Sequence, residues 1–387
     1  MRLAKIFTCL LLFCCLSKST HRSGILPQEA YIWQKLWVPS VQNAIQQSNF
    51  LLKGWRFLAG EREPDGRIIY PSIPFDDLQS MGKMLTAVYR FDRIQPLPNV
   101  QEIRELVTRS PVYQKGIRNI ELDLDWPTQK LAAYVYLLKQ LRSCLPQETY
   151  LTITVLPDWL RSTEFPNLTQ KVDDLILQVH AVDDPREGLF NDHKALHYID
   201  RMSRISRKPF YIALPTYGLK VGMERNGRLN FVEGENNLWL GKTVGQELFT
   251  DPYQITKFLN HLETDIPMNL KGLVWFRLPI AEDRRNWSIS TWLTVLQRRK
   301  LYTQIKIENR VDPQDTGLFD LFAVNQGNID ARLPLKVELK CAIGDGFPPY
   351  QLSIGNNGHY FLESIKNPPF LPVGAKRRIG WMRCLSQ

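Results

Sequence analysis

Short apolar runs alternate with amphipathic stretches along most of the chain, from about residue 30 to about residue 297. Eight of the runs have the character of buried strands, and most of the stretches between them have the spacing of helices. The strands are expected within residues 30–37, 54–61, 85–91, 116–127, 150–156, 172–182, 209–214 and 272–278. This order predicts an α/β fold, a (β/α)8 barrel of the TIM type. A doubly wound open sheet alternates in a similar way, but no Gly-rich phosphate loop follows the first run.

The pattern changes after about residue 302, where shorter alternating runs are separated by Gly, Pro and Asn turns. These runs predict a small all-β unit of sandwich type. The expected organisation is therefore a signal segment at 1–22, a barrel at 27–300 and a sandwich-like domain at 302–387. The last of these could be an accessory that packs on the barrel or a carbohydrate-binding unit, and accessory packing is favoured.

The fourth run is the most informative, because its polar positions near the strand end are acidic. Alternation at a period of two places three carboxylates on one face of the strand: Glu121, Asp123 and Asp125. Because their charges repel, at least one pKa should be raised, as a general acid requires. In a parallel barrel this end of the strand lies at the rim where catalytic groups gather. The alternative is a solvated strand end whose acids simply face water.

The N-terminal residues have the pattern of a secretory signal. Arg2 and Lys5 precede an apolar run of 11 residues at 6–16, which is short for a membrane span. Cys15 stands where a bacterial lipoprotein carries its lipid, although residues 12–15 match that motif poorly, so membrane anchoring through a lipidated Cys15 is left open. We expect an exported protein, either periplasmic or membrane-anchored in a bacterial envelope.

The cysteines outside the signal fit an oxidising compartment. Cys341 and Cys384 both lie in the C-terminal region and are expected to form a disulfide, whereas Cys144 is expected to be a buried thiol. No Cys/His spacing resembles a zinc site, and no cofactor is expected. Carboxylates such as those of the acidic strand suit Mg²⁺ or Ca²⁺, but three ligands from one strand cannot surround an ion.

The net charge of +10 bears on partners rather than on fold. The sequence has no run of five or more basic residues and no nucleic-acid-binding motif, so nucleic acid is not expected. After export, an acidic glycan or the envelope surface is the favoured counterpart. Part of the excess charge could serve only solubility.

The acidic strand, placed fourth of eight, resembles that of the chitinase-like glycoside hydrolases of family 18. In that family the strand ends in Asp-x-x-Asp-x-Asp-x-Glu, and Glu121, Asp123 and Asp125 occupy the last three acidic places. Residues 175–180, 208–218 and 271–276 are similar to its sixth, seventh and eighth strands. Over roughly residues 30–297 the resemblance implies a barrel and a polysaccharide or other glycan as partner.

The chain is more similar still to an exported bacterial family known only as a domain of unknown function. The residues that carry this similarity lie at 31–37, 122–127, 152–154 and 177–180. Both resemblances imply fold more firmly than activity.

The resemblance to the hydrolases assigns roles and also exposes departures. It implies Asp125 as general acid, Asp123 as its polarising neighbour and Tyr217 as a possible assistant. Asp125 is one methylene shorter than the Glu of that family, and Arg118 stands where the family has the first acidic residue of its motif. On the sixth strand, Met and Tyr of the family are replaced by two other residues, Gln178 and His180.

Further candidates for contact with a sugar lie on the first, sixth and eighth strands: Trp33, Gln178, His180, Trp275 and Arg277. The tryptophan rings could stack on sugar faces, and His180 could exchange protons. Arg277 could neutralise the carboxylates if Trp275 points inward. Core aromatic and core histidine roles carry similar weight, and a shift of one in the register of the eighth strand would turn Phe276 inward instead.

Two functions follow. The favoured one is a glycoside hydrolase-like enzyme that acts on an envelope or extracellular glycan with Asp125 as general acid. The alternative is a non-catalytic barrel that binds a glycan or a protein through a decayed hydrolase site.

Overall fold

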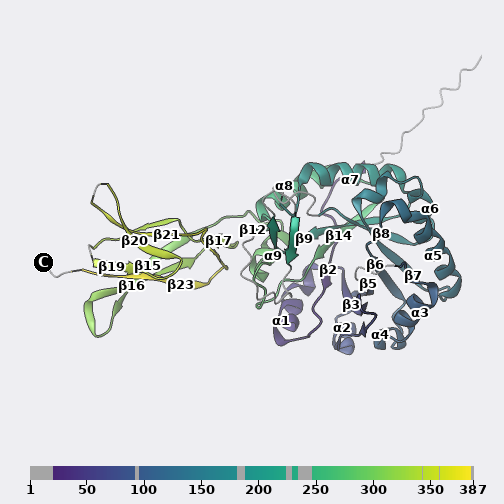
Figure 1. Ribbon diagram of the computed structural model, residues 1–387, viewed down its shortest axis with the longest axis horizontal. Coiled ribbons are helices and arrows are strands. Elements are labelled where there is room, and N and C mark those ends of the chain that lie inside the picture. The colour runs from purple at the N-terminus through teal and green to yellow at the C-terminus, as the bar shows by residue number, and fades with distance from the viewer. Residues whose placement is uncertain are drawn as a thin grey trace, which may run out of the picture.

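The computed structural model describes residues 21–91, 96–180, 188–223, 229–233, 246–341, 343–356 and 358–384. The expected signal segment, including Cys15, lies almost entirely outside these residues. Two parts are visible, a helix-coated barrel and an elongated group of antiparallel strands at the C-terminal end (Figure 1).

The first part is a closed barrel of eight parallel strands, which confirms the predicted fold. Each strand pairs with its sequence neighbours, and β2 pairs with both β3 and β14, which closes the ring. The strands are β2 (Gln28–Ile32), β3 (Gly54–Arg62), β5 (Met84–Phe91), β6 (Asn119–Leu124), β7 (Tyr150–Val155), β8 (Asp174–Gln178), β9 (Phe210–Pro215) and β14 (Leu270–Phe276).

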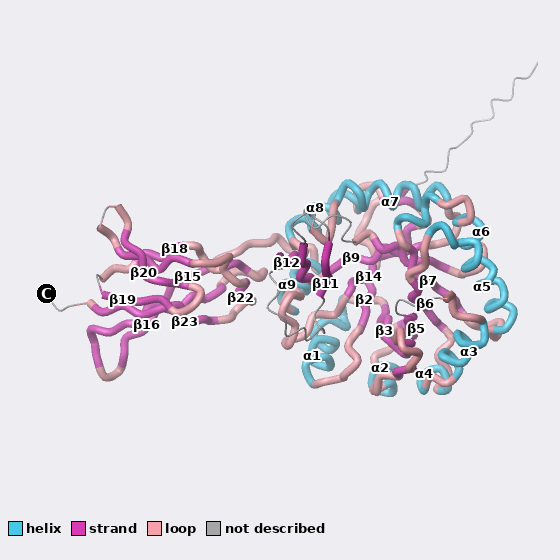
Figure 2. The backbone as a smooth tube through the Cα atoms, viewed as in Figure 1, coloured by secondary structure: helices cyan, strands magenta, loops and turns pink. Residues whose placement is uncertain are grey.

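Helices coat the outside of the ring (Figure 2). They are α1 (Pro39–Ser48), α2 (Phe75–Ser80), α3 (Val100–Thr108), α4 (Pro111–Gln114), α5 (Leu131–Cys144), α6 (Phe165–Thr169), α7 (Asp192–Ile205), α8 (Pro252–Leu262) and α9 (Ile289–Leu296). Local sequence explains their ends. Asn99 and Glu102 form a reciprocal capping box at the start of α3, and α5 buries one stripe of apolar side chains that ends at Leu141. Cys144 follows that stripe and is exposed, so the expected buried thiol is wrong.

Short antiparallel strands lie beside the barrel strands or in the loops between them. The strand β4 (Ile68–Ile69) pairs with β3, and β1 (His21–Arg22) pairs with β13 (Ile266–Pro267). The polar segment after β9 forms an antiparallel sheet of β10 (Leu219–Met223), β11 (Leu229–Glu233) and β12 (Gln246–Leu248).

Some strands are shorter than the sequence suggests, and two of these differences shape the rim of the barrel. The first ends at Ile32, and the Gln34 side chain that follows it donates to the backbone carbonyl of Leu278, just after the neighbouring strand β14, at 2.9 Å. The fourth ends at Leu124, so Asp125 lies in the loop that follows it. There the buried Trp126 donates its indole N–H to the carbonyl of Lys130, 3.0 Å away, and fixes the turn.

The C-terminal part consists of antiparallel strands that enclose a separate apolar core. One sheet has the order β15-β16-β23-β19, a second has the order β18-β21-β20, and β17 pairs with β22. The strands are β15 (Ile305–Asp312), β16 (Asp315–Asn325), β17 (Ala331–Arg332), β18 (Lys336–Glu338), β19 (Ile343–Gly346), β20 (Tyr350–Ile354), β21 (Tyr360–Ser364), β22 (Phe370–Leu371) and β23 (Lys376–Arg383). Cys341 and Cys384, the cysteines expected to pair, form a disulfide.

Candidate functional site

A pocket of about 140 Å³ opens at the C-terminal ends of the barrel strands. Its wall is built from seven of the eight strands or the residues that follow them. The lining residues are Tyr31, Trp33, Arg90, Glu121, Asp123, Asp125, Thr154, Gln178, His180, Ala213, Tyr217 and Phe276. The structure thus brings together all three carboxylates of the acidic strand and four of the other predicted site residues.

Asp123 is held in place by neighbours on both sides of its strand. The hydroxyl of Thr154 on β7 donates to its Oδ1 at 2.9 Å, and the Arg90 guanidinium on β5 lies 3.8 Å from its Oδ2. The side chain of Asp123 is 15% exposed, so it reaches the pocket while remaining fixed.

Asp125 differs from Asp123 because it lies beyond the end of β6 and is exposed. It shares the pocket wall with Asp123, so a ligand in the pocket would face both carboxylates. One acid is therefore immobilised inside the ring, and the other stands at its mouth.

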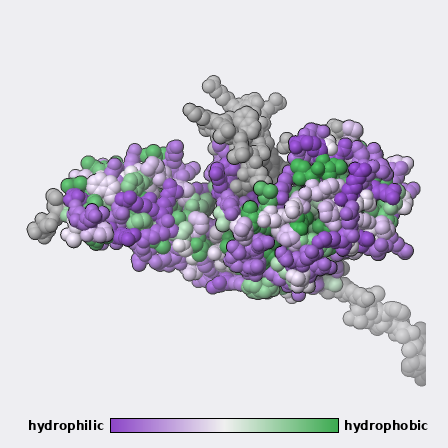
Figure 3. Space-filling model, turned by 90° about the horizontal axis from the view of Figure 1, so that it is seen from below, coloured by the Kyte–Doolittle hydropathy of each residue, from purple (hydrophilic) through white to green (hydrophobic). Residues whose placement is uncertain are grey.

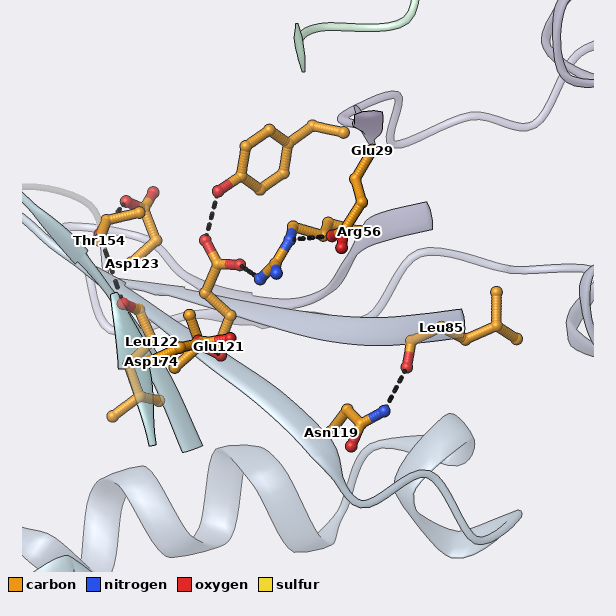
Figure 4. A network of polar contacts seen from close by, with 11 residues as sticks. Glu29, Arg56, Leu85, Asn119, Glu121, Leu122, Asp123, Thr154 and Asp174 are labelled. Carbon is orange, nitrogen blue, oxygen red and sulfur yellow. Dashed lines mark hydrogen bonds and ion pairs between the residues drawn. The ribbon is translucent and has the colours of Figure 1, made fainter. Parts of the chain in front are cut away.

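Glu121 lies deepest and belongs to a buried polar network inside the barrel (Figure 4). Its Oε1 accepts from the Tyr31 hydroxyl at 2.5 Å, and its Oε2 accepts from Nη1 of Arg56 at 2.6 Å. The Nε of Arg56 donates in turn to Glu29 at 2.7 Å. Both oxygens of Glu121 thus already accept hydrogen bonds, which fits a supporting position better than direct contact with a substrate.

Burial gives Glu121 an unusual titration. Removal from water raises its pKa to about 7, although Arg56 and Tyr31 favour the charged form and partly oppose the shift. Burial also raises the pKa of Asp174 in the barrel interior. Its Oδ1 accepts a hydrogen bond from the Thr152 hydroxyl at 2.5 Å. The predicted raised pKa on the acidic strand thus falls on its most buried member.

Aromatic rings form the opposite wall of the pocket. Phe276 is their centre, with ring centroids 5.0 Å from Trp33, 5.5 Å from Tyr217 and 6.0 Å from His180. Burial raises the pKa of Tyr217, so it is a neutral phenol at physiological pH. Flat apolar faces opposite carboxylates are the surroundings that a sugar ring requires, because one side of the ring is apolar and its edge is polar.

His180 is neutral and held by the backbone. Its Nδ1 lies 3.0 Å from the carbonyl oxygen of Ala213, which can only accept, so Nδ1 carries the proton and Nε2 is left as an acceptor. Burial lowers the pKa of His180 to about 4. The ring is therefore suited to accept a hydrogen bond, and it carries no charge at neutral pH.

Two predicted substrate contacts, Trp275 and Arg277, do not line the pocket. Trp275 points outward from the ring, is fully buried and donates its indole N–H to Gln28 at 3.2 Å. Arg277 pairs with Asp283 at 2.6 Å, so it does not neutralise the acidic strand. The register of β14 is the cause, because successive residues point to opposite faces and Phe276 is the one that points inward.

Several residues of this site were not singled out from the sequence, among them Tyr31, Arg56, Arg90 and Thr154. Tyr31 and Arg56 both bind Glu121 from strands more than 60 positions away in sequence. Arg90 lies near the end of an ordinary apolar run, and its partnership with Asp123 depends on the pairing of β5 with β6. Their only sequence signal is a polar residue within a run that otherwise reads as buried.

The described ranges contain no group of three or more His, Cys, Asp or Glu side chains placed to hold a metal ion. Within those ranges, no helix combines the length and the apolar character needed to cross a membrane.

Several solved structures are similar to this chain at low sequence identity. The spore cortex-lytic enzyme SleL of Bacillus cereus has a TM-score of 0.47 and 14% identity, covering 72% of this chain and 75% of that one. A chitinase from Chromobacterium violaceum has a TM-score of 0.47 and 10% identity, covering 70% and 98%. The family 18 chitinase ChiB of Flavobacterium johnsoniae has a TM-score of 0.44 and 12% identity, covering 71% and 94%. No curated protein matches the chain in sequence.

Family models cover both parts of the chain. Residues 308–385, the C-terminal strands, match a domain of unknown function, DUF8456. Residues 82–281 match another, DUF3142, over the six barrel strands from β5 to β14 and over every acidic residue of the pocket. This match spans more than half of the sequence, and the chain belongs to the DUF3142 family of domains of unknown function.

Proposed function

We propose that the protein is a glycoside hydrolase that acts on an envelope or extracellular glycan, with Asp125 as its general acid. One observation carries the proposal. A fixed carboxylate and an exposed one, Asp123 and Asp125, share a pocket with a wall of aromatic rings at the C-terminal mouth of a closed barrel.

The two carboxylates have different tasks in this proposal. Asp125 donates a proton to the glycosidic oxygen as the bond from that oxygen to the anomeric carbon breaks. Positive charge develops on the sugar, and the ionised Asp123 stabilises it directly or by orienting a substrate group that attacks the same carbon. Thr154 and Arg90 hold Asp123 in position for that task. A water molecule then takes the place of the leaving group, and its proton returns to Asp125.

Tyr217 and His180 complete the substrate contacts. The Tyr217 hydroxyl is a neutral donor at the pocket, and Nε2 of His180 is an acceptor for a sugar hydroxyl. Phe276 provides a face on which a sugar ring can stack.

An export route supports the choice of substrate. The secretory pattern at residues 1–22 and the disulfide between Cys341 and Cys384 both suit a compartment outside the cytoplasm. In a bacterial envelope the abundant cleavable polymers are glycans. Attachment through a lipidated Cys15 is a further part of this proposal.

A binding role without catalysis is the second candidate, and a specific observation favours it. Gln178 and His180 line the pocket where the resemblance to family 18 hydrolases places Met and Tyr, and Asp125 is shorter than the Glu of that family. A barrel of this kind would hold the same glycan and release it unchanged.

The test is turnover on a panel of purified glycans, including chitin oligosaccharides and peptidoglycan. For any glycan that is cleaved, Asp125→Asn should lower the rate by about 10²–10⁴-fold, the usual worth of a general acid. Asp158→Asn is the matched control, because Asp158 is also an exposed aspartate next to a barrel strand but does not line the pocket. Binding without turnover across the panel would favour the second candidate.

A further inference from the structure

A second, larger cleft of about 950 Å³ lies between the barrel and the C-terminal strands. The barrel contributes α1, the loop that follows β14 and the segment that joins β12 to α8. The C-terminal part contributes β17, Phe370 of β22 and residues next to these two strands. Figure 1 shows α9 and β12 on the side of the barrel that faces those strands.

Direct hydrogen bonds hold the two sides of this cleft in fixed positions. The carboxylate of Asp330 accepts from the backbone N–H of Ser288 at 2.7 Å, and the backbone N–H of Asp330 donates to Thr291 at 2.8 Å. The hydroxyl of Thr294 donates to the carbonyl of Asn328 at 3.0 Å. Because these contacts connect α9 to the C-terminal part, the cleft is formed before any ligand arrives.

Aromatic side chains from both sides line the cleft. The rings of Phe249 and Phe370 meet at 4.9 Å, and the Arg332 guanidinium covers Phe370 at 4.3 Å. Tyr253, in the first turn of α8, is 46% exposed. Amide and hydroxyl side chains also line the cleft, including those of Asn43, Gln47, Ser290 and Thr303. Apolar faces interspersed with neutral hydrogen-bonding groups suit the faces and hydroxyls of sugars.

The charges that line the cleft are already balanced within the protein. Asp283 pairs with Arg277 and Glu247 with Arg285, at 2.6 Å and 3.4 Å. Two other carboxylates, Asp330 and Asp251, accept backbone N–H groups. With Glu282, which accepts from Ser40, five carboxylates stand against four guanidinium groups among the described lining residues and their partners, so the charges nearly cancel. A charged ligand would therefore gain little there, and a neutral one is favoured.

The cleft is distinct from the pocket at the mouth of the barrel. The two share none of their described lining residues. The chain that follows β9 lies between the cleft and the pocket. There the hydroxyl of Thr250 donates to the carbonyl of Tyr217 at 2.7 Å, and the backbone N–H of Trp287 donates to the carbonyl of Thr216 at 2.9 Å.

We infer that this cleft is a binding site for a neutral oligosaccharide, separate from the carboxylate pocket. The aromatic faces stack on sugar rings, and the amides and hydroxyls bond their hydroxyl groups. The inference does not rest on hydrolysis, because the cleft lacks the carboxylates of the acidic strand and would bind glycan in a purely binding protein as well.

Isothermal titration calorimetry of the full chain measures its affinity for chitopentaose and for cellopentaose and tests the inference. Every protein in this test carries Asp125→Asn, which prevents turnover of the probes. Tyr253→Ala combined with Phe370→Ala should weaken binding of at least one of these probes tenfold or more. Tyr253→Ala alone, at an exposed position, should weaken it severalfold without changing the melting temperature. Tyr136→Ala is the control, because Tyr136 is 62% exposed on α5 and does not line the cleft.

Three results would overturn the inference. One is unchanged affinity in the Tyr253 and Phe370 variants. Another is loss of all binding when the pocket alone is altered by Trp33→Ala and Tyr217→Ala. The third is absence of binding by both neutral probes, or tighter binding of an acidic oligogalacturonate. Loss of turnover in Asp125→Asn is a separate measurement, so the inference and the proposed hydrolase activity can fail independently.

Discussion

At the scale of single residues, Glu121 shows how burial separates three acids that look alike in the sequence. Asp123 is fixed at the pocket, Asp125 is exposed, and Glu121 is fully buried between Tyr31 and Arg56. Repulsion along a strand predicts that one acid has a raised pKa. It does not say which one, because the answer depends on partners supplied by other strands.

Glu121 should therefore make the stability of the protein depend on pH. Its pKa is about 7 in the folded state and 4.5 for an ordinary glutamate, so between these values the folded state holds a proton that the unfolded state releases. The free energy of unfolding should fall as pH rises from 4.5 to 7, with a contribution on the order of 3 kcal/mol at about 1.4 kcal/mol per pKa unit.

Chemical denaturation of the wild type and of Glu121→Gln at several pH values measures this contribution. The fall over that pH range should be smaller in Glu121→Gln, because the amide does not titrate. Glu164→Gln, at a partly buried glutamate outside the barrel interior, is the control and should keep the wild-type slope. Parallel curves for Glu121→Gln and the wild type would contradict the prediction.

At the scale of elements, β14 separates a packing role from a binding role in adjacent residues. Trp275 is fully buried between the ring and its helices, with Trp287 at a ring distance of 6.1 Å. Phe276 points into the pocket and contacts Trp33, His180 and Tyr217.

Replacement of Trp275 and of Phe276 by Ala should have opposite effects on stability and on glycan binding. Trp275→Ala should lower the free energy of unfolding by about 3–5 kcal/mol, because it leaves a large cavity in the core. Phe276→Ala should cost less stability and should weaken glycan binding or turnover more strongly. Denaturant titration and a binding assay on both variants check this. A greater loss of binding in a still-folded Trp275→Ala would reverse the register described here.

The strands themselves were largely predictable, since every barrel strand lies within or beside a run that reads as buried in the sequence. Alternation at a period of two identifies such a run, but in a strand buried on both faces it does not say which face is inside, as Trp275 and Phe276 show. In the C-terminal part the alternating runs that predict strands lie at 303–308, 318–325, 335–341, 350–354 and 378–383, and four of the observed strands lie outside them: β17, β19, β21 and β22. Two of these have only two residues, too short for any periodic pattern.

The candidate site was predictable only where one strand carries it. Glu121, Asp123 and Asp125 stand out because they alternate with apolar residues at a period of two. Arg56 and Arg90 could not be recognised, because a single polar residue in an apolar run has no meaning until the neighbouring strand is known. The carboxylates of the site could therefore be predicted from the sequence, and the arginines that pair with them could not.

At the scale of the whole molecule, the two largest apolar cores of the described residues lie around the barrel and between the C-terminal sheets. The disulfide between Cys341 and Cys384 joins β23 to the chain before β19 within the second core only. Its contribution should therefore be local.

Loss of this disulfide should destabilise the C-terminal part and spare the barrel. Closure of a loop with a sequence separation of 43 residues should contribute about 2–4 kcal/mol. In Cys341→Ser combined with Cys384→Ser, hydrogen exchange should accelerate in peptides from β15 to β23 and stay unchanged in those from β2 to β9. Cys144→Ser, at the exposed thiol, is the control. Equal acceleration in both parts would contradict two independent cores.

The central claim is that Asp125 supplies the proton to a leaving glycosidic oxygen, and the dependence of rate on the leaving group tests it most directly. The measurement compares phenyl and 2,4-dinitrophenyl glycosides of the sugar that the wild type releases. Asp125→Asn should slow hydrolysis of the phenyl glycoside by about 10²–10⁴-fold, because a phenolate leaves slowly unless it is protonated. The same variant should barely slow hydrolysis of the dinitrophenyl glycoside, because dinitrophenolate leaves without protonation. An equal loss on both substrates, or no loss on either, would contradict the role assigned to Asp125.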